Sequence, residues 1–116
     1  MYDKNNIFAK ILRKEIPCNK VYEDSFSLFF NDINPQAKIH ILGIPKFPCT
    51  TFSEFIKNAD KENITSFFNS VQFVINKLDI EINGYRLITN SGEDGGQEVP
   101  HFHIHILAGE KIGSLR

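Results

Sequence analysis

Residues 101–108 read His-Phe-His-Ile-His-Ile-Leu-Ala, and the first six positions alternate strictly between imidazole and apolar side chains. Successive residues of a β-strand point to opposite faces of a sheet, so this alternation predicts a half-buried strand over 101–108. Phe102, Ile104 and Ile106 would then enter the core. The three histidines, His101, His103 and His105, would share the other face.

Hydrophobic periodicity and turn signals predict the remaining elements. We expect a long helix over 61–78, capped by Asp60, with one apolar face. That face is formed by Ile64, Phe67, Phe68, Val71, Val74, Ile75 and Leu78. We expect a short helix over 7–13, capped by Asn5 or Asn6, whose continuation Pro17 forbids. Four further strands are expected over 20–23, 25–31, 38–45 and 85–90. The order predicts an α+β domain with an antiparallel five-stranded sheet, one long helix and one short helix.

Composition and charge exclude several classes of protein. The 116 residues include 13 basic and 14 acidic ones, and a net charge of −1 offers no general field for binding nucleic acid. No apolar run approaches the roughly 20 residues of a membrane-spanning helix, and the N-terminus lacks the apolar core of a secretory signal. Cys18 and Cys49 are expected to be reduced thiols. We therefore expect one cytoplasmic domain over 1–116, with neither nucleic acid nor membrane as a partner.

The three histidines allow two interpretations besides catalysis, a solvent-exposed polar face without a function and a metal site. They could form a polar strand face exposed to solvent. Two histidines at i and i+2 could also reach one Zn²⁺ ion, but His101 and His105 would stand about 13 Å apart along a straight strand. No Cys, Asp or Glu lies nearby with recognisable ligand spacing, although Glu98 is a distant candidate. We expect neither a metal ion nor another cofactor.

Nucleophilic catalysis explains the spacing better than either alternative. A neutral imidazole is a good nucleophile toward phosphorus, and neighbouring imidazoles can orient it and transfer protons. The preceding segment, residues 90–97, reads Asn-Ser-Gly-Glu-Asp-Gly-Gly-Gln. Its glycines allow backbone N–H groups to approach an anion, and the Asn90 amide can donate to a phosphoryl oxygen. The two segments together predict a phosphate-binding catalytic site.

These residues resemble the histidine-triad (HIT) superfamily, whose signature is His-φ-His-φ-His-φ-φ, where φ is apolar. Residues 95–100, Gly-Gly-Gln-Glu-Val-Pro, look like the loop of its Hint branch. Residues 7–17 and 30–46 are also similar to that branch, and the resemblance covers nearly the whole chain in the family's order. It implies the HIT-like fold and a homodimer whose sheet continues between subunits.

The resemblance also implies an activity. Hint-branch proteins are nucleotide-binding hydrolases that cleave purine nucleoside 5′-phosphoramidates, which join AMP or GMP to an amine, through a nucleotidyl-histidine intermediate. Two alternatives remain open. One is a non-catalytic nucleotide sensor or adaptor, and the other is a hydrolase of dinucleoside polyphosphates.

By matching position, four histidines would form the catalytic group. His103 would be the nucleophile, and His105 would contact the phosphate and the leaving group. The backbone carbonyl of His101 would accept from Nδ1–H of His103, so that Nε2 is free to attack. His40 would support the triad from a neighbouring strand. From the sequence alone, a core histidine satisfied by a backbone group is the favoured interpretation of His40.

The nucleotide would be bound by residues from three segments. Asp32 would accept both ribose hydroxyls, although a carboxylate before Pro35 also suits a turn cap. The phosphate pocket would be lined by Asn90, Gly96, Gln97, Glu98 and the N–H of Val99. The base would be enclosed by Ile7, Phe8, Ile11, Phe30 and Ile33, for which ordinary core packing is the alternative.

The chain departs from the family pattern at three places. Glu98 stands where some members carry a small hydroxyl residue near the leaving group, and its carboxylate would repel a phosphate. Residues 108–110, Ala-Gly-Glu, replace the more usual Gly-Gly-Arg and remove a cation. The sequence ends at Arg116, so we expect it to lack the C-terminal segment that contributes to substrate choice in longer members.

Overall fold

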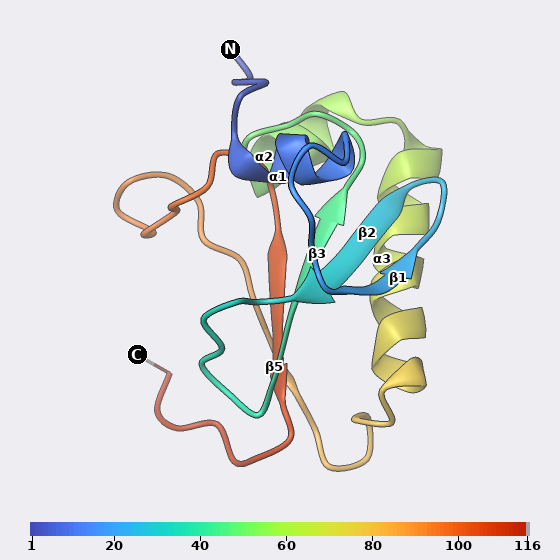
Figure 1. Cartoon of the computed structure of the whole chain (residues 1–116), viewed down its shortest axis with the longest axis vertical. Helices are drawn as coiled ribbons and strands as arrows, with labels where there is room; N and C mark the ends of the chain where they lie inside the picture. The colour runs from blue at the N-terminus through green and yellow to red at the C-terminus, as the bar shows by residue number, and fades with distance from the viewer. Residues whose placement is uncertain (116) are drawn as a thin grey trace.

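A five-stranded antiparallel sheet forms the centre of the computed structural model, which describes residues 1–115 (Figure 1). The strands are β1 (Lys20–Glu23), β2 (Ser27–Asn31), β3 (Ile39–Pro45), β4 (Arg86–Ile88) and β5 (Ile104–Ala108). They lie in the order β1-β2-β3-β5-β4. The predicted α+β class and the five strands are therefore confirmed. Arg116, the last residue of the predicted domain, lies outside the described residues.

Within the described residues, three helices accompany the sheet: α1 (Ile7–Leu12), α2 (Phe52–Asn58) and α3 (Lys61–Lys77). The predicted caps are confirmed, because Asn6 accepts from the Ala9 N–H and Asp60 accepts from the Asn63 N–H. Helix α2 corrects the prediction of a single short helix. Its signal is present in the sequence, since Thr51 and Glu54 have the Thr-x-x-Glu spacing of a capping box, and Thr51 Oγ1 accepts from the Glu54 N–H.

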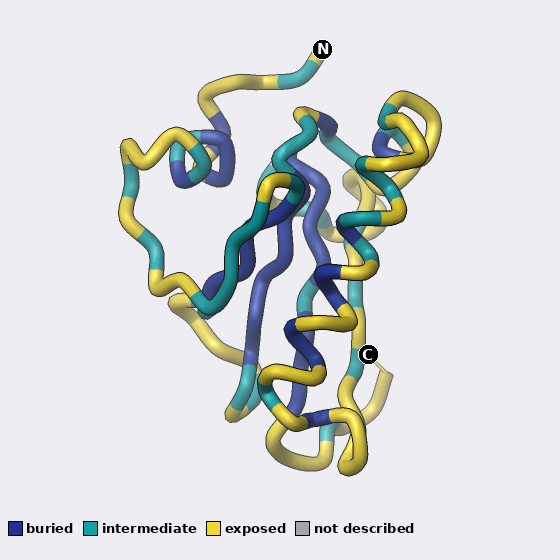
Figure 2. Tube along the Cα trace, turned by 90° about the vertical axis from the view of Figure 1, so that its right-hand side faces the viewer, coloured by how far each residue is buried: buried dark blue, intermediate teal, exposed yellow. Residues whose placement is uncertain are grey.

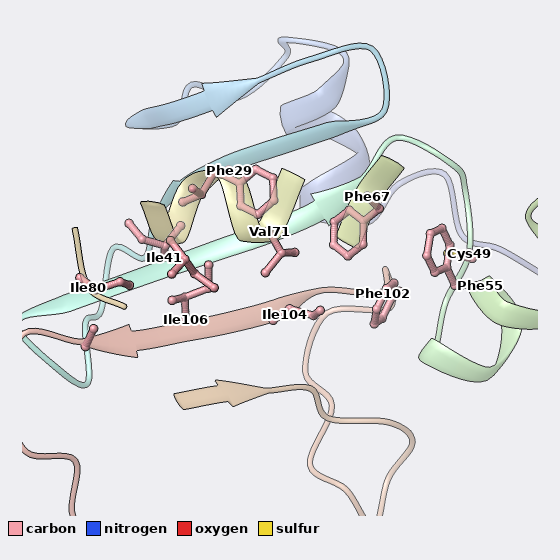
Figure 3. Close-up of a cluster of buried hydrophobic side chains, with 13 residues drawn as sticks. Phe29, Ile41, Cys49, Phe55, Phe67, Val71, Ile80, Phe102, Ile104 and Ile106 are labelled. Atoms are coloured by element: carbon pink, nitrogen blue, oxygen red, sulfur yellow. The ribbon is translucent and has the colours of Figure 1, made fainter. Parts of the chain in front are cut away.

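The main core lies between the sheet and helix α3, where four phenylalanine rings pack among aliphatic side chains (Figure 3). Phe67 of α3 stacks on Phe29 of β2, and Phe55 of α2 stacks on Phe102. Gly43 lies opposite Phe29 in the β2–β3 register, and a Cβ atom there would overlap the Phe29 ring. Phe67, Val71, Val74 and Ile75 of the predicted apolar face are buried in this core, so that face of α3 is the one that packs on the sheet.

The opposite face of the sheet is covered only in part, by helix α1. Phe8 and Ile11 of α1 pack against Phe30, Leu42 and Ile44. Figure 2 shows the central strands as the most deeply buried part of the chain. The short α1 leaves a hollow beside it on this face. Within residues 1–115, no helix has the length and apolar character needed to cross a bilayer.

The strand predicted over 101–108 begins only at Ile104. Before that point the backbone forms other hydrogen bonds: the His101 N–H donates to the Val99 carbonyl, and the Phe102 N–H donates to the Cys49 carbonyl. Phe102 nevertheless enters the main core with Ile104 and Ile106, as the alternation predicted. His101 and His103 are thus positioned by an irregular segment rather than by the sheet ladder.

Candidate active site

A cavity of about 510 Å³ occupies the face beside α1 and contains most of the predicted site. It is bounded by α1, by the connection from β2 to β3, by the loop over residues 90–99 and by β5. The predicted residues that line it are Ile7, Phe8, Ile11, Phe30, Asp32, Ile33, His40, Asn90, Gly96, Glu98, Val99, His103 and His105. His101 and Gln97 are the two predicted residues that do not line it.

His103 is held in one tautomer by the backbone. Its Nδ1 lies 2.6 Å from the His101 carbonyl oxygen, and because a carbonyl can only accept, Nδ1 carries the proton. The Nε2 lone pair is then free in the neutral ring. Phe8 meets the ring edge-on at 5.0 Å, and His103 is 6% exposed. Burial lowers the pKa of His103 against the opposing effect of the carbonyl bond, which keeps the imidazole neutral and nucleophilic.

A hydrogen bond from His40, on the neighbouring strand β3, sets the tautomer of His105. The Gln36 N–H donates to His40 Nδ1 at 2.9 Å, so neutral His40 carries its proton on Nε2. That Nε2 lies 2.9 Å from His105 Nδ1, which must therefore accept. Neutral His105 consequently carries its own proton on Nε2. These two hydrogen bonds, from Gln36 to His40 and from His40 to His105, leave His105 with one N–H that can donate to a molecule in the cavity.

The histidines that line the cavity are all biased toward the neutral form. Burial, together with the neighbouring His103 and His40, lowers the pKa of His105 to about 4. Burial also lowers the pKa of His40, against the opposing charge of Asp32. The site therefore presents one imidazole lone pair and one imidazole N–H together at neutral pH.

His101 lies behind the cavity and is completely buried. Its Nε2 donates to the Pro45 carbonyl at 2.8 Å, and its Nδ1 then accepts from the hydroxyl of Tyr2 at 2.5 Å. Sequence reasoning missed Tyr2, and no local pattern could have revealed it, because the contact joins residues 99 positions apart. The ring of His101 thus fixes the segment whose carbonyl orients His103.

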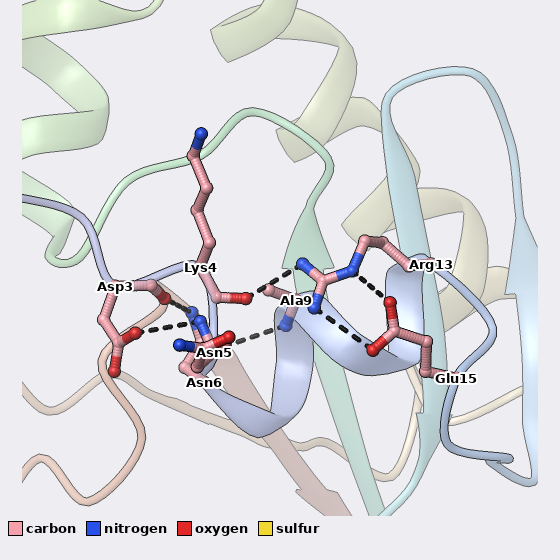
Figure 4. A network of polar contacts seen from close by, with 7 residues as sticks. All are labelled: Asp3, Lys4, Asn5, Asn6, Ala9, Arg13 and Glu15. Carbon is pink, nitrogen blue, oxygen red and sulfur yellow. Dashed lines mark hydrogen bonds and ion pairs between the residues drawn. The ribbon is translucent and has the colours of Figure 1, made fainter.

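Polar contacts before and after α1 hold the N-terminal segment that carries Tyr2 (Figure 4). Asp3 accepts from the Asn5 N–H through its carboxylate and from Asn6 Nδ2 through its carbonyl. Arg13 donates to the Lys4 carbonyl while it is paired with Glu15. These contacts hold Asp3 and Lys4 beside α1, and Tyr2 directly precedes them in the sequence.

The loop over 90–99 is organised by its own amides. Asn90 Nδ2 donates to the Gly95 carbonyl at 2.8 Å, which leaves its second N–H for the cavity. The Gln97 amide donates to the Thr50 and Val99 carbonyls and accepts from the Gly92 N–H. Gln97 was predicted to line the phosphate pocket, and the structure corrects this: its side chain is fully engaged in shaping the loop.

Asp32 lies where the chain leaves β2, at the edge of the cavity. Its Oδ1 accepts from the Asn34 N–H at 2.8 Å, the turn-capping contact that the sequence allowed, and its Oδ2 lies 3.3 Å from His40 Nε2. The carboxylate still lines the cavity beside Ile33, which is 89% exposed. Phe8, Ile11 and Phe30 form a buried apolar wall. Ile7, for which core packing was the alternative, is instead 44% exposed at the rim.

Three ligand atoms that suit a metal ion also meet in the cavity, on Asp32, His40 and His105. They lie within 4.8 Å of one another, and two imidazoles with one carboxylate can bind zinc or iron. The sequence did not reveal this set because Asp32 comes from a different connection. The His40–His105 hydrogen bond already satisfies two of the ligand atoms, so an ion would have to displace the shared proton.

Comparisons with known proteins agree on one family. The HIT domain family matches residues 13–112. An uncharacterised HIT-like protein of Azospirillum brasilense is 47% identical over 98% of this chain and 93% of its own. The purine nucleoside phosphoramidase of Escherichia coli is 40% identical over 97% of this chain and 93% of its own. A solved histidine triad protein from Clostridium difficile is 39% identical, with a TM-score of 0.88 over the whole of both chains.

Proposed function

The chain belongs to the HIT domain family of nucleotide-binding hydrolases, and from that premise we propose that it hydrolyses the P–N bond of purine nucleoside 5′-phosphoramidates. The observation that carries the proposal is the fixed tautomer of His103, whose Nδ1–H is bound to the His101 carbonyl. Nε2 of His103 therefore carries a free lone pair, and the ring is buried and neutral. The similarity to a protein named purine nucleoside phosphoramidase supports the choice of substrate.

The reaction would proceed in two displacements at phosphorus. Nε2 of His103 attacks the phosphorus, the P–N bond breaks, and the leaving nitrogen takes a proton from Nε2 of His105 in its imidazolium form, to which solvent supplies the second proton and which returns to the neutral ring. A nucleotidyl-histidine and a free amine result. Water then attacks the same phosphorus, the bond to His103 breaks, and His105 Nε2 takes the proton of the water. The product is the nucleoside monophosphate, and both imidazoles return to their starting state.

The remaining lining residues would bind the nucleotide. The apolar wall of Phe8, Ile11 and Phe30 suits a purine ring, which buries a large flat surface. Asp32 would accept from the ribose hydroxyls, since an ionised carboxylate is acceptor-only. Asn90, Gly96 and the Val99 N–H would surround the phosphate from the loop, while Ile7 and Ile33 would cover the base at the rim.

The experiment that tests the proposal is a hydrolysis screen over conjugates of AMP and GMP with a simple amine. We expect release of the nucleoside monophosphate at a rate proportional to enzyme concentration. Binding of AMP without release from any conjugate would overturn the proposal and favour a nucleotide sensor or adaptor. Faster hydrolysis of dinucleoside polyphosphates than of the amine conjugates would favour the other alternative.

We also propose that the active protein is a homodimer whose sheet continues across the subunits. Strand β4 is an edge strand, paired on one side with β5 and on the other with nothing in residues 1–115. An open edge is a template for pairing with another chain. Leu87 on this strand is 44% exposed and Tyr85 just before it is 38% exposed, so an apolar surface accompanies the free edge.

Light scattering at micromolar concentration is expected to give twice the 13.3 kDa chain mass. Leu87→Asp would place a charge on the β4 surface and should shift the protein to the monomer. Ile56→Asp is the matched control, because Ile56 is exposed to a similar extent, 42%, on α2. A monomer mass for the unmodified protein would refute the dimer.

A further inference from the structure

The segment that carries His101 and His103 lies outside the sheet ladder, because β5 begins only at Ile104. The peptide between residues 101 and 102 is held on one side by the Phe102 N–H, which donates to the Cys49 carbonyl at 2.9 Å. On its other side, the His101 carbonyl accepts from Nδ1 of His103 at 2.6 Å. The position of this carbonyl, which sets the tautomer of His103, therefore depends on tertiary contacts and not on strand pairing.

The ring of His101 is a further anchor of this segment. It is completely buried, and burial lowers its pKa to about 4, so the ring is neutral at neutral pH. Its Nε2 donates to the Pro45 carbonyl at 2.8 Å, which leaves a lone pair on Nδ1. A buried acceptor without a donor costs free energy, since water cannot reach it. Among the described residues, the donor that meets this lone pair is the hydroxyl of Tyr2, at 2.5 Å.

Tyr2 is placed to make this contact by its ring as well as by its hydroxyl. The ring meets that of His101 edge-on, with centroids 5.6 Å apart. Burial raises the pKa of Tyr2, against the opposing effect of the Asn6 side chain, so the phenol stays protonated and able to donate. The Asn6 N–H donates to the Asp3 carbonyl at 3.2 Å, in the turn that connects Tyr2 with α1. Tyr2 is not among the residues that line the cavity.

We propose that Tyr2 is a positioning residue for the hydrolysis: its hydroxyl holds the His101 ring, and the His101 carbonyl in turn keeps Nε2 of His103 free to attack phosphorus. The inference rests on the proposed function, which makes His103 the nucleophile. Without the hydroxyl, the buried Nδ1 of His101 loses its donor and regains one only if the ring rotates or shifts. Either change displaces the carbonyl that orients His103, and a displaced nucleophile reacts more slowly while the substrate still binds.

Tyr2→Phe is the test, because it removes the hydroxyl and preserves the ring that packs on His101. We expect kcat for an adenosine 5′-phosphoramidate of a simple amine to fall by about tenfold. The AMP affinity, measured by calorimetry, should stay unchanged, because the variant keeps the apolar wall beside α1 and Asp32. Tyr22→Phe is the matched control. It also removes a phenolic hydroxyl, but Tyr22 packs against the main core on the other face of the sheet, and its variant should keep the full kcat.

Nitrogen-15 NMR of the imidazoles, recorded without substrate, separates positioning from a general loss of stability. The unmodified protein should show His103 as the Nδ1–H tautomer and His101 as the Nε2–H tautomer with a hydrogen bond at Nδ1. In Tyr2→Phe the Nδ1 signal of His101 should move toward that of an unbonded nitrogen, and His103 should become a mixture of its two tautomers. His40 and His105 should keep their tautomers, because they are bonded to each other and not to His101.

The outcomes distinguish this inference from the proposed function. An unchanged kcat in Tyr2→Phe, an unchanged tautomer of His103, or an equal loss of activity in Tyr22→Phe would overturn the positioning role of Tyr2 and leave the proposed function standing. Failure of the unmodified protein to hydrolyse the conjugate would instead overturn the proposed function, whatever the tautomers show.

Discussion

His103→Ala is expected to lower single-turnover hydrolysis of an adenosine 5′-phosphoramidate by about a thousandfold or more, a barrier increase of about 4 kcal/mol. The reason is that the substitution deletes the only step that forms the nucleotidyl-histidine. His105 cannot replace it, because its Nδ1 accepts from His40 and its Nε2 carries the proton that the leaving group needs. The measurement is rapid mixing of excess enzyme with the conjugate.

Binding separates loss of the nucleophile from loss of the site. Asp32, the loop over 90–99 and the apolar wall remain in His103→Ala, so AMP affinity measured by calorimetry should change by no more than about 1–2 kcal/mol. His103→Asn is the matched control, since its amide can still donate to the His101 carbonyl but offers no imidazole. It should lose activity to the same extent. Retention of more than about a tenth of the activity in either variant would show that His103 is not the nucleophile.

The free energy of unfolding is expected to fall by about 2 kcal/mol between about pH 7.5 and about pH 5 from His101 alone. Burial lowers the pKa of His101 to about 4, against the opposing bond to the Pro45 carbonyl, whereas an unfolded histidine titrates near 6.5. Between these two values the unfolded chain binds more protons than the folded one. Stability is therefore fully present above about pH 6.5 and is lost as the pH falls toward 4.

Urea denaturation at a series of pH values measures how the free energy of unfolding changes with pH. His40, His103 and His105 also have lowered pKa values, and they steepen the loss in the same direction. His101→Gln, which does not titrate, should reduce the decrease by about 2 kcal/mol whatever its effect on stability at neutral pH. An equal decrease in His101→Gln and in the unmodified protein would contradict the assignment of the slope to His101.

Much of the fold was predictable because periodicity reports which face of an element is buried. The alternation in 102–106 placed Phe102, Ile104 and Ile106 in the core, and the repeat in 61–78 identified the helix that covers it. Local caps were equally readable, as Asn6 and Asp60 show, and the capping box at Thr51 could have identified α2. These signals are local, since each depends on residues within one or two turns of the chain.

The candidate site was predictable as a set of residue types but not as a network. The sequence alone determined that three imidazoles follow a glycine-rich loop, and with the family resemblance it indicated His103 and the loop residues. The resemblance also indicated the tautomer of His103, but only the tertiary structure decided which nitrogen of His40, His101 and His105 carries the proton, because Gln36, Pro45 and Tyr2 supply the deciding partners. It also showed Gln97 to be a loop-shaping residue.

The physical reason is the range of the interactions. Burial on one face of a strand or helix follows from the spacing of apolar residues along the chain, so it can be predicted from the sequence alone. A hydrogen bond between Tyr2 and His101, or between His40 and His105, depends on the path of every segment between the partners. The sequence by itself therefore determined which residues are able to do the chemistry, and the tertiary structure decided their protonation, their partners and the open side of the cavity.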